Sequence, residues 1–483
     1  MNTTSHPFHR NLIGGEWKPA SDVQENRSPS NVNDVVGLYA QGDATDVAQA
    51  VAAARAALDN WWSRGPQARS DVLDAAATEL QNHRSEIGRL LAREQGKTLA
   101  EATAEVMRAS QIFRFFAGEA LRMTGERIDS VRPNVDIEVT REPAGVVGLI
   151  TPWNFPIAIP AWKVAPALAY GNTVIIKPAD LTPGSVHALA EILMRCGCPP
   201  GAFNLVMGRG RVVGNALVEH PGVDAISFTG SEGVGRDVIA RCAASHKRVQ
   251  AEMGGKNPTV ILDDADLQHA VAAGISSAYG STGQRCTATS RFIVEQGIRQ
   301  DFETAFVEAA TRIVVGDSLN PCTTMGPVVS SSQLAANLGY VELARREGAR
   351  VVGGERVDTG VPGHYQRPAV FLDATNDMRV SREEIFGPCA SIIEARDFEH
   401  ALALANDTLY GLSSAICTRN LKFAREFKRR SQAGLVMVNL PSAGVDFHVP
   451  FGGRKGSSFG PREQGTYARD FYTTVKTAYT LAV

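Results

Sequence analysis

The sequence predicts an α/β fold with a Rossmann-type domain, a second α/β domain and a small β element. Short apolar strands alternate with helical stretches from Gly145 onward, and a second pattern of this kind starts after Gly255. β-type residues alternate near Asp129 and again at the C-terminus. The chain of 483 residues is also too long for one core, because a domain holds roughly 150 residues.

The first hundred residues are expected to be mostly helical. In Thr45 to Leu58, "TDVAQAVAAARAAL", apolar residues recur at helical spacing behind a suitable N-cap. Pro66 to Thr98 continues in the same style.

A β-hairpin is expected next, in residues 125–143. The stretch "DSVRPNVDIEVTREPAG" holds alternating β-type residues on both sides of a turn. The C-terminal stretch "FYTTVKTAYTLAV", residues 471–483, alternates in the same way. It reads as a terminal strand that could pair with the hairpin, on this subunit or on another one.

A parallel, doubly wound sheet is predicted for the segment that follows. Its strands are "VVGLI", "TVIIKP", "FNLVMG" and "DAISFTG", and its helices include "AWKVAPALAYG" and "SVHALAEILMRC". We place a boundary near Gly255. Residues 1–124 and 144–255 then form a dinucleotide-binding domain, and residues 256–470 form a catalytic domain.

Composition excludes several classes of function. A formal net charge of −2 gives no basic field for a nucleic acid, and no apolar run approaches the roughly 18 residues of a membrane span. The segment "MNTTSHPFHR" lacks the layout of a signal peptide, so a cytoplasmic location is expected. Seven cysteines are too few and too odd in number for a disulfide framework, and no metal site is predicted.

Some polar motifs stand where an open α/β sheet binds ligands. Gly230 and Ser231 follow a strand and begin a helix, so backbone N–H groups could face a phosphate, although a plain helix cap is equally suitable. Lys177 and Asp180 follow another strand, where a solvated lysine and an N-cap are the alternative. The stretch "MGRGRVVG" is weaker, because its glycine spacing departs from the dinucleotide fingerprint.

Other residues have side chains suited to acyl chemistry. Cys286 in "TGQRCTATSR" is either a nucleophile or an ordinary thiol. Asn154 in "TPWNFP" could stabilise an oxyanion or simply satisfy a turn. Glu252 in "AEMGGKNP" could be a general base or a paired carboxylate. Phe386, which follows Glu384, could stack on a flat ring or belong to the core.

The order of these motifs resembles the aldehyde dehydrogenase superfamily over nearly the whole chain, so an aldehyde dehydrogenase-like fold is expected. The resemblance implies that the Cys286 thiolate attacks an aldehyde, that hydride passes to a nicotinamide, and that the resulting thioester is hydrolysed. Asn154 and the Cys286 N–H would then form the oxyanion hole, and Glu252 would activate water. Relatives that transfer the acyl group to coenzyme A generally lack this glutamate, so an acid product is expected. Glu463 stands where some relatives carry a proton-relay acid.

The resemblance also implies NAD as the cofactor, with NADP possible. Lys177 would reach the adenosine ribose, and Asp180 stands where many NAD-preferring relatives have glutamate. We therefore predict a preference for NAD with some use of NADP. The implied cofactor-binding residues are Ile150, Trp153, Lys177, Asp180, Gly230, Ser231, Glu384 and Phe386.

Within the superfamily, the C-terminal motif "PSAGVDFHVPFGGRKGSSFGPREQG" is most similar to the branch that oxidises 2,5-dioxopentanoate, also called α-ketoglutarate semialdehyde. Gly280 and Trp162 stand where succinate semialdehyde dehydrogenases carry arginines. Arg285 and Arg454 could bind a substrate carboxylate instead, or face backbone and solvent. Phe155 and Trp162 would form apolar walls.

Three alternatives to this function stay open. The enzyme could act on succinate or glutarate semialdehyde, or on aliphatic aldehydes in general. The chain could also be a catalytically silent relative that serves as a binding or structural protein. The hairpin and the terminal strand resemble the oligomerisation elements of the superfamily, so a homodimer or homotetramer is expected.

Overall fold

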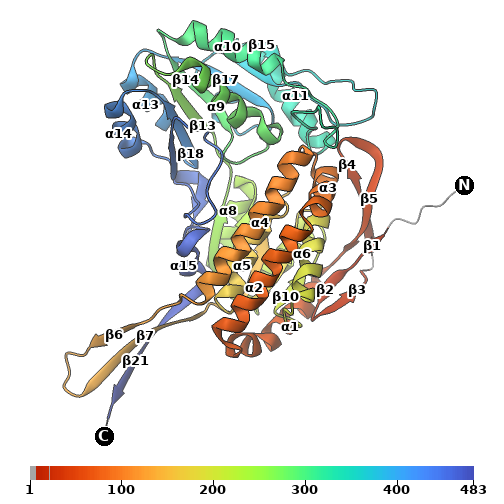
Figure 1. The fold of residues 1–483 in the computed structure, drawn as a ribbon, viewed down its shortest axis with the longest axis vertical. Coiled ribbons are helices and arrows are strands. Elements are labelled where there is room, and N and C mark those ends of the chain that lie inside the picture. Colours follow the sequence, from red (N-terminus) through yellow and green to blue (C-terminus); the bar gives the residue numbers. More distant parts are fainter. Residues whose placement is uncertain (1–6, 21, 483) are drawn as a thin grey trace, which may run out of the picture.

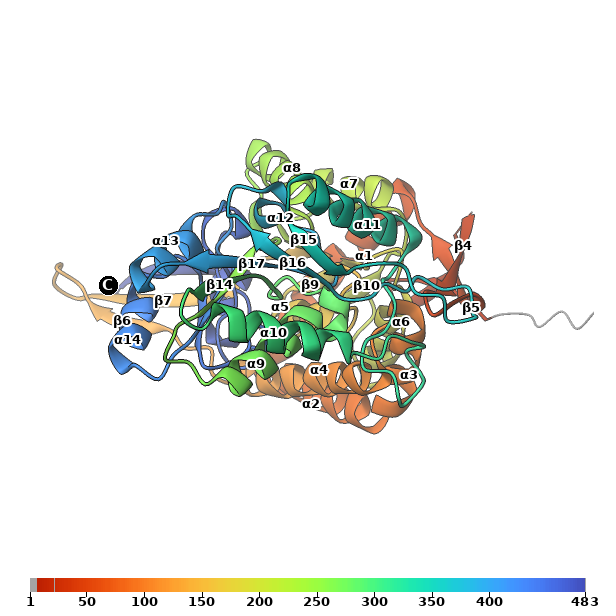
Figure 2. The same cartoon turned by 90° about the horizontal axis from the view of Figure 1, so that it is seen from above.

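The protein forms two lobes and a three-stranded sheet that projects from one of them (Figure 1). A computed structural model describes residues 7–20 and 22–482. The first lobe contains an eight-stranded sheet and the second a seven-stranded sheet. Seen from above, the projecting sheet extends well beyond both lobes (Figure 2).

The first lobe is built on the eight-stranded sheet, in the order β20-β12-β11-β8-β9-β10-β2-β3. Its parallel strands are β8 (Val146–Ile150), β9 (Thr173–Lys177), β10 (Phe203–Leu205), β11 (Ala225–Thr229) and β12 (Arg248–Glu252). The helices between them are α5 (Ala158–Ala169), α6 (Gly184–Arg195), α7 (Asn215–Glu219) and α8 (Glu232–Ala244).

The chain reverses direction across this sheet between β8 and β11. It runs from β8 through β9 to β10 on one side, and then returns to place β11 and β12 on the other side of β8. β8, β9 and β11 are almost entirely buried, as expected for strands covered by helices on both faces. This is the doubly wound arrangement predicted from the sequence, and its ligand crevice lies at the carboxyl ends of β8 and β11.

Three long helices, α2 (Gly65–Asn82), α3 (Arg84–Gln95) and α4 (Leu99–Ala120), share a core with one face of the first sheet, whereas α1 (Ala44–Ser63) packs mainly on the other face. Capping boxes start α1 at Asp43 and α4 at Thr98. The prediction of a mostly helical start is wrong for the residues before α1. These residues form β1 (Phe8–His9), β2 (Asn11–Ile13), β3 (Glu16–Lys18), β4 (Asp22–Ser28) and β5 (Asn31–Gln41). Distant pairing stabilises them in part, because β2 pairs antiparallel with β10.

The second lobe is the second α/β unit. Its sheet has the order β15-β16-β17-β14-β13-β18-β19, and only β15 runs antiparallel to its neighbour. The strands are β13 (Asn257–Ile261), β14 (Thr289–Glu295), β15 (Arg350–Gly353), β16 (Ala369–Ala374), β17 (Cys389–Ala395), β18 (Ser413–Cys417) and β19 (Leu435–Val438). The helices are α9 (Leu267–Tyr279), α10 (Arg299–Thr311), α11 (Ser331–Arg346), α12 (Arg379–Arg382), α13 (Phe398–Asn406) and α14 (Leu421–Arg430).

After β19 the chain returns to the first lobe. β20 (Ser458–Phe459) pairs antiparallel with β12, and α15 (Arg469–Tyr472) leads into the last strand. This differs from the predicted catalytic domain of residues 256–470, because pairing with β12 assigns β20 to the first sheet. No local signal in the sequence marks this return.

The projecting sheet contains the predicted hairpin, β6 (Glu126–Asp129) and β7 (Val135–Pro143). β21 (Thr473–Leu481) pairs antiparallel with β7 along its whole length, within the same chain. β21 therefore forms one edge of this sheet.

All seven cysteines are free thiols. Among the described helices, none is both long and apolar enough to cross a membrane. Within residues 7–20 and 22–482, no cluster of three His, Cys, Asp or Glu side chains could hold a metal ion.

Candidate active site

Two cavities meet at Cys286, the residue that lines both of them. We name them the strand-end cavity and the helix-side cavity. The strand-end cavity, of about 180 Å³, is lined by Pro152, Trp153, Asn154, Ile159, Thr229, Gly230, Ser231, Met253, Gly254, Cys286, Gln333, Glu384 and Phe386. The helix-side cavity, of about 430 Å³, is lined by Lys97, Glu101, Ala104, Glu105, Arg108, Gln111, Phe155, Ala158, Trp162, Ser281, Arg285, Cys286, Thr287, Ala443, Gly444, Val445, Phe451 and Gln464.

The strand-end cavity lies at the carboxyl ends of β8 and β11, where the chain reverses its direction across the first sheet. Trp153 follows β8, while Gly230 and Ser231 join β11 to α8. The first N–H groups of a helix have no partner within the helix and attract anions. The Thr229 hydroxyl is buried there and has no hydrogen-bond partner within the described residues. This end of the cavity therefore suits an anionic group such as a phosphate.

Glu384 and Phe386 form the opposite wall of the strand-end cavity. The Gly255 N–H donates to Glu384 Oε1 at 2.9 Å, and burial raises the pKa of Glu384 to about 7. A Cβ at Gly254 would lie 2.0 Å from Glu384 Oε2, so only glycine fits beside this carboxyl group. Phe386 has a φ of +59° and packs edge-on against Trp153, with ring centroids 5.3 Å apart. Together these residues form a wall with one flat aromatic edge and one polar group.

Lys177 and Asp180 lie at the same sheet edge, one strand further along. Ile150 and Lys177 are paired at the ends of β8 and β9. The Lys177 Nζ and Asp180 Oδ1 atoms are 3.1 Å apart. Burial lowers the pKa of Lys177, and the charge of Asp180 opposes that change. Ile150, Lys177 and Asp180 do not line the strand-end cavity itself, but they extend its edge toward β9.

A strained turn precedes Cys286. Ser281 and Thr282 have φ values of +50° and +60°, and Gly283 follows at +66°. The left-handed conformation costs a residue with a Cβ about 1–2 kcal/mol. Glu101 of α4 holds the turn, because its Oε1 accepts the Ser281 N–H at 2.7 Å and the Ser281 hydroxyl at 3.2 Å. The position of the thiol therefore depends on a helix of the other lobe.

The surroundings of the Cys286 thiol favour its protonated form. Burial raises its pKa to about 12, and the negative charges of Glu384 and Glu252 contribute to the shift. A thiol is a weak nucleophile compared with its thiolate. Attack by Cys286 thus requires a base or a nearby positive charge.

Glu252 is suited to be that base. It ends β12, and its side chain is only 2% exposed. The Ser458 hydroxyl donates to Glu252 Oε2 at 2.5 Å, while Oε1 is buried without a partner among the described residues. Burial, followed by the charge of Glu463, raises the pKa of Glu252 well above its usual value. A carboxylate of this kind takes up a proton at higher pH than a solvated one, although Glu252 lines neither cavity.

A buried polar network lies behind Glu252. Lys163 of α5 forms an ion pair with Glu463 Oε1, and its Nζ also donates to the Ser227 hydroxyl at 2.7 Å. The oxygen atoms of Ser227 and Glu463 are 3.1 Å apart. Sequence analysis identified Glu463 but missed Lys163 and Ser227. A lysine inside the apolar helix "AIPAWKVAPALA" was the available signal, because a buried lysine needs a partner.

Asn154 is buried close to the nucleophile, and its Nδ2 donates to the Gln284 carbonyl at 3.1 Å. A second ion pair, which sequence analysis missed, holds its loop. Lys97 Nζ donates to Glu105 Oε2 at 2.6 Å and to the Asn154 carbonyl at 2.8 Å. Glu105 Oε1 accepts the N–H groups of Ile157 and Ala158 at 3.0 and 3.1 Å. The loop that carries Asn154 is therefore fixed at both ends.

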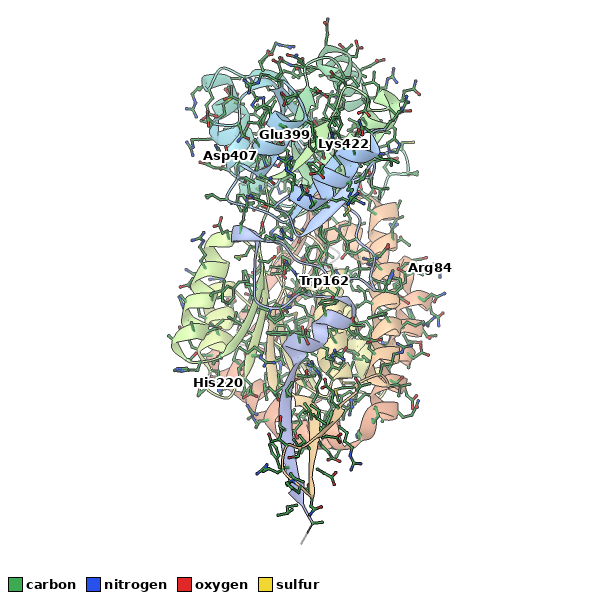
Figure 3. The ribbon with its side chains drawn as sticks, turned by 90° about the vertical axis from the view of Figure 1, so that its left-hand side faces the viewer. Arg84, Trp162, His220, Glu399, Asp407 and Lys422 are labelled. Carbon is green, nitrogen blue, oxygen red and sulfur yellow. The ribbon has the colours of Figure 1, made fainter. Side chains whose placement is uncertain are left out.

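The predicted substrate residues have different environments. Phe155 and Trp162 line the helix-side cavity, and Trp162 stacks on Phe451 with centroids 5.3 Å apart. Figure 3 shows Trp162 in the interior, near the level where the two lobes meet. Arg285 also lines this cavity, but its Nε and Nη2 donate to the carbonyls of Gly280 and Ser276 at 2.8 and 3.0 Å.

The structure does not bring Arg454 to the site. Its side chain is exposed and lines neither cavity, and its backbone N–H donates to the Gly411 carbonyl in the second lobe. The expected substrate contact by Arg454 is therefore not supported. Two residues that sequence analysis did not single out, Arg108 and Gln464, do line the helix-side cavity.

Comparisons with known proteins agree with this geometry. The sequence model described as "Aldehyde dehydrogenase family" matches residues 17–478. The chain is 44% identical over 481 residues to the alpha-ketoglutaric semialdehyde dehydrogenase of Bacillus subtilis (strain 168), covering 99% of both chains. It is 37% identical to the 2,5-dioxopentanoate dehydrogenase of Saccharolobus solfataricus, covering 97% of this chain and 98% of that protein.

A solved structure is also similar in fold. The betaine aldehyde dehydrogenase of Staphylococcus aureus in complex with NAD⁺ superimposes with a TM-score of 0.96 and 33% identity, covering 98% of this chain and 95% of that chain. The expected fold class is thus confirmed. The chain belongs to the aldehyde dehydrogenase family and is an enzyme that oxidises aldehydes.

Proposed function

We propose that this enzyme oxidises 2,5-dioxopentanoate to 2-oxoglutarate with NAD as the hydride acceptor. The observation that carries the proposal is the position of Cys286 at the junction of two cavities, one suited to a nucleotide and one to an aldehyde. The names of the two similar semialdehyde dehydrogenases support the choice of substrate.

The strand-end cavity fits a nicotinamide dinucleotide. The start of α8 at Gly230 and Ser231 suits the pyrophosphate, and the unpartnered hydroxyl of Thr229 is available beside it. Glu384 and Phe386 would hold the nicotinamide ribose and ring, while Lys177, Asp180 and Ile150 would hold the adenosine half. When bound, the nicotinamide accepts the hydride that the aldehyde carbon loses.

The residues of the chain carry out the remaining steps. Glu252 takes the proton from the Cys286 thiol, either directly or through water, and the thiolate adds to the aldehyde carbon. Asn154 Nδ2 and the Cys286 N–H stabilise the oxyanion of the thiohemiacetal. After hydride loss a thioester remains on Cys286. Glu252 releases the thiol proton to solvent and then deprotonates a water that adds to the thioester. The C–S bond breaks, the acid leaves, and the Cys286 thiolate takes the second proton back from Glu252.

We also propose that the enzyme assembles as a homodimer or homotetramer through the projecting sheet. β21 presents Val475, Tyr479 and Leu481, which are between 56% and 59% exposed, on an edge strand. Exposed apolar residues on a free edge favour pairing with another chain. Light scattering on the full chain measures the mass directly, and a monomer would contradict this assignment. The seven free thiols support the reducing cytoplasm as its location.

The substrate proposal is tested by kcat/KM with NAD for four aldehydes. These are 2,5-dioxopentanoate, glutarate semialdehyde, succinate semialdehyde and an uncharged aldehyde of similar length. We expect 2,5-dioxopentanoate to be preferred over the uncharged aldehyde by at least about tenfold, the effect of about 1.4 kcal/mol of binding energy. Equal values for the charged and uncharged substrates would refute the proposal while leaving aldehyde oxidation in place.

A further inference from the structure

Arg108 is a positively charged residue of the helix-side cavity. It lies on α4 and lines the cavity, and its guanidinium group forms no hydrogen bond or ion pair with any described residue. The other positive groups there are occupied, because Lys97 binds Glu105 and Arg285 binds two backbone carbonyls. Arg108 therefore has its donors free for a ligand.

The acidic groups of the cavity are also occupied. Glu101 accepts hydrogen bonds from Ser281 and Thr98, and Glu105 accepts them from Lys97 and from two backbone N–H groups. The exposed Asp446 contributes a charge near Arg108 but lies beyond the 4.0 Å of an ion pair. The uncompensated charge of the cavity is consequently positive, which favours an anionic ligand over a neutral one.

Arg108 lies away from the thiol along the axis of α4. Glu101 holds the turn before Cys286, and Arg108 comes seven residues later, which is a rise of about 10 Å along a helix. The Arg108 guanidinium carbon lies 5.7 Å from the centre of the Phe447 ring, in a loop whose residue Gly444 is exposed. Arg108 therefore lies farther along α4 than the residue that holds the turn before Cys286, beside the loop that contains Phe447.

We propose that Arg108 binds the carboxylate of the semialdehyde while the aldehyde group reaches Cys286. This inference rests on the proposed function, and it names the residue that selects a carboxylated substrate. A guanidinium group can bind a carboxylate with two parallel hydrogen bonds, and contact with an aromatic ring leaves that planar edge free. Partial burial strengthens the pairing relative to one in bulk water.

The buried amide of Gln464 offers a second polar contact. Gln464 is 0% exposed and lines the same cavity, and both its Oε1 and Nε2 lack a partner among the described residues. Its neighbour Gly465 lies against His448 and Val449, close in sequence to Phe447. An amide N–H at this wall can donate to the 2-oxo group beside the carboxylate.

The test compares Arg108→Met with the wild-type enzyme on glutarate semialdehyde and on pentanal, which have chains of equal length. We expect KM for the charged substrate to rise about tenfold to a hundredfold, as for a lost charged hydrogen bond, with kcat changed much less. The kinetic constants for pentanal should stay within about twofold. Arg108→Lys should recover only part of the loss, because an ammonium group cannot form the bidentate pair.

Arg114→Met is the matched control. Arg114 lies on the same helix, but it is exposed and pairs with Asp74 at 3.2 Å outside the cavity. Its removal changes the net charge by the same amount, so it should leave both substrates unaffected.

The outcomes separate this inference from the proposed function. If the wild-type enzyme prefers charged aldehydes and Arg108→Met keeps that preference, the role of Arg108 is refuted and the proposed function stands. If the wild-type enzyme shows no preference, both fail. Equal losses on the two substrates in Arg108→Met would indicate structural damage to the cavity and would also refute the anchoring role.

Discussion

The strand-end and helix-side cavities share Cys286 but are built in different ways. The strand-end cavity collects residues from the carboxyl ends of β8, β11 and β12 and from the turn before β17. The helix-side cavity takes its walls from one face of α4, from α5 and from the loop after β19. Strand ends of a parallel sheet meet at one edge by necessity, whereas helix faces and loops meet only through tertiary packing. The first cavity is therefore far more predictable than the second.

The largest effect is expected at the residue that the two cavities share. Cys286→Ser should lower kcat by at least about 10⁴-fold, because the hydroxyl is a much weaker nucleophile and the acyl intermediate depends on sulfur. Cys322→Ser is the control, since Cys322 is an exposed thiol outside both cavities and should keep full activity. Steady-state rates with NAD measure both variants. Activity retained in Cys286→Ser would disprove the assignment of the nucleophile.

A smaller effect is expected at Glu252, which acts as the base both for the Cys286 thiol and for the hydrolytic water. Glu252→Gln should reduce turnover by about a hundredfold to ten-thousandfold, the range for loss of a general base. The wild-type rate should increase as the pH rises through the raised pKa of Glu252, because the base acts only when ionised.

The buried network behind Glu252 sharpens this prediction. Glu463 raises the pKa of Glu252, so Glu463→Gln should move the half-maximal pH downward by about one unit. The pH profile of kcat for the three enzymes checks both statements. An upward shift, or an unchanged profile in Glu463→Gln, would contradict the proposed coupling.

The smallest effect is expected at the far end of the strand-end cavity. Asp180→Glu should raise the ratio of kcat/KM for NAD to that for NADP by about fivefold, because a longer acid reaches nearer the 2′-hydroxyl and repels a 2′-phosphate. Parallel assays with the two cofactors provide the ratio. If the variant instead accepted NADP more readily, the role of Asp180 would have to be reassigned.

The sequence predicted the residues of the strand-end cavity better than it predicted those of the helix-side cavity. The motifs at Asn154, Gly230 and Cys286 were readable because each is local and each ends or follows a regular element. The role of Lys97 was not readable, because its contact with the Asn154 carbonyl joins residues that are distant in the chain and arises only in the folded protein.

The arginines illustrate the same limit. Arg285 and Arg454 were predicted to bind substrate because they lie close in sequence to recognisable motifs. In the structure Arg285 donates to nearby backbone carbonyls, and Arg454 is exposed. Arg108 lies in an ordinary helical stretch that nothing in the sequence distinguishes. The N-terminal strands were missed for a related reason, because their main partners are distant in the chain or depend on a turn.

The left-handed turn at Ser281 and Thr282 has a consequence for how this protein can evolve. Glycine would remove about 1–2 kcal/mol of strain at each position, so the chain is less stable here than it could be. A glycine would also give the segment before Cys286 more freedom in the folded state and loosen the grip of Glu101. Variants that gain thermal stability at this turn should therefore be the ones that lose catalytic rate.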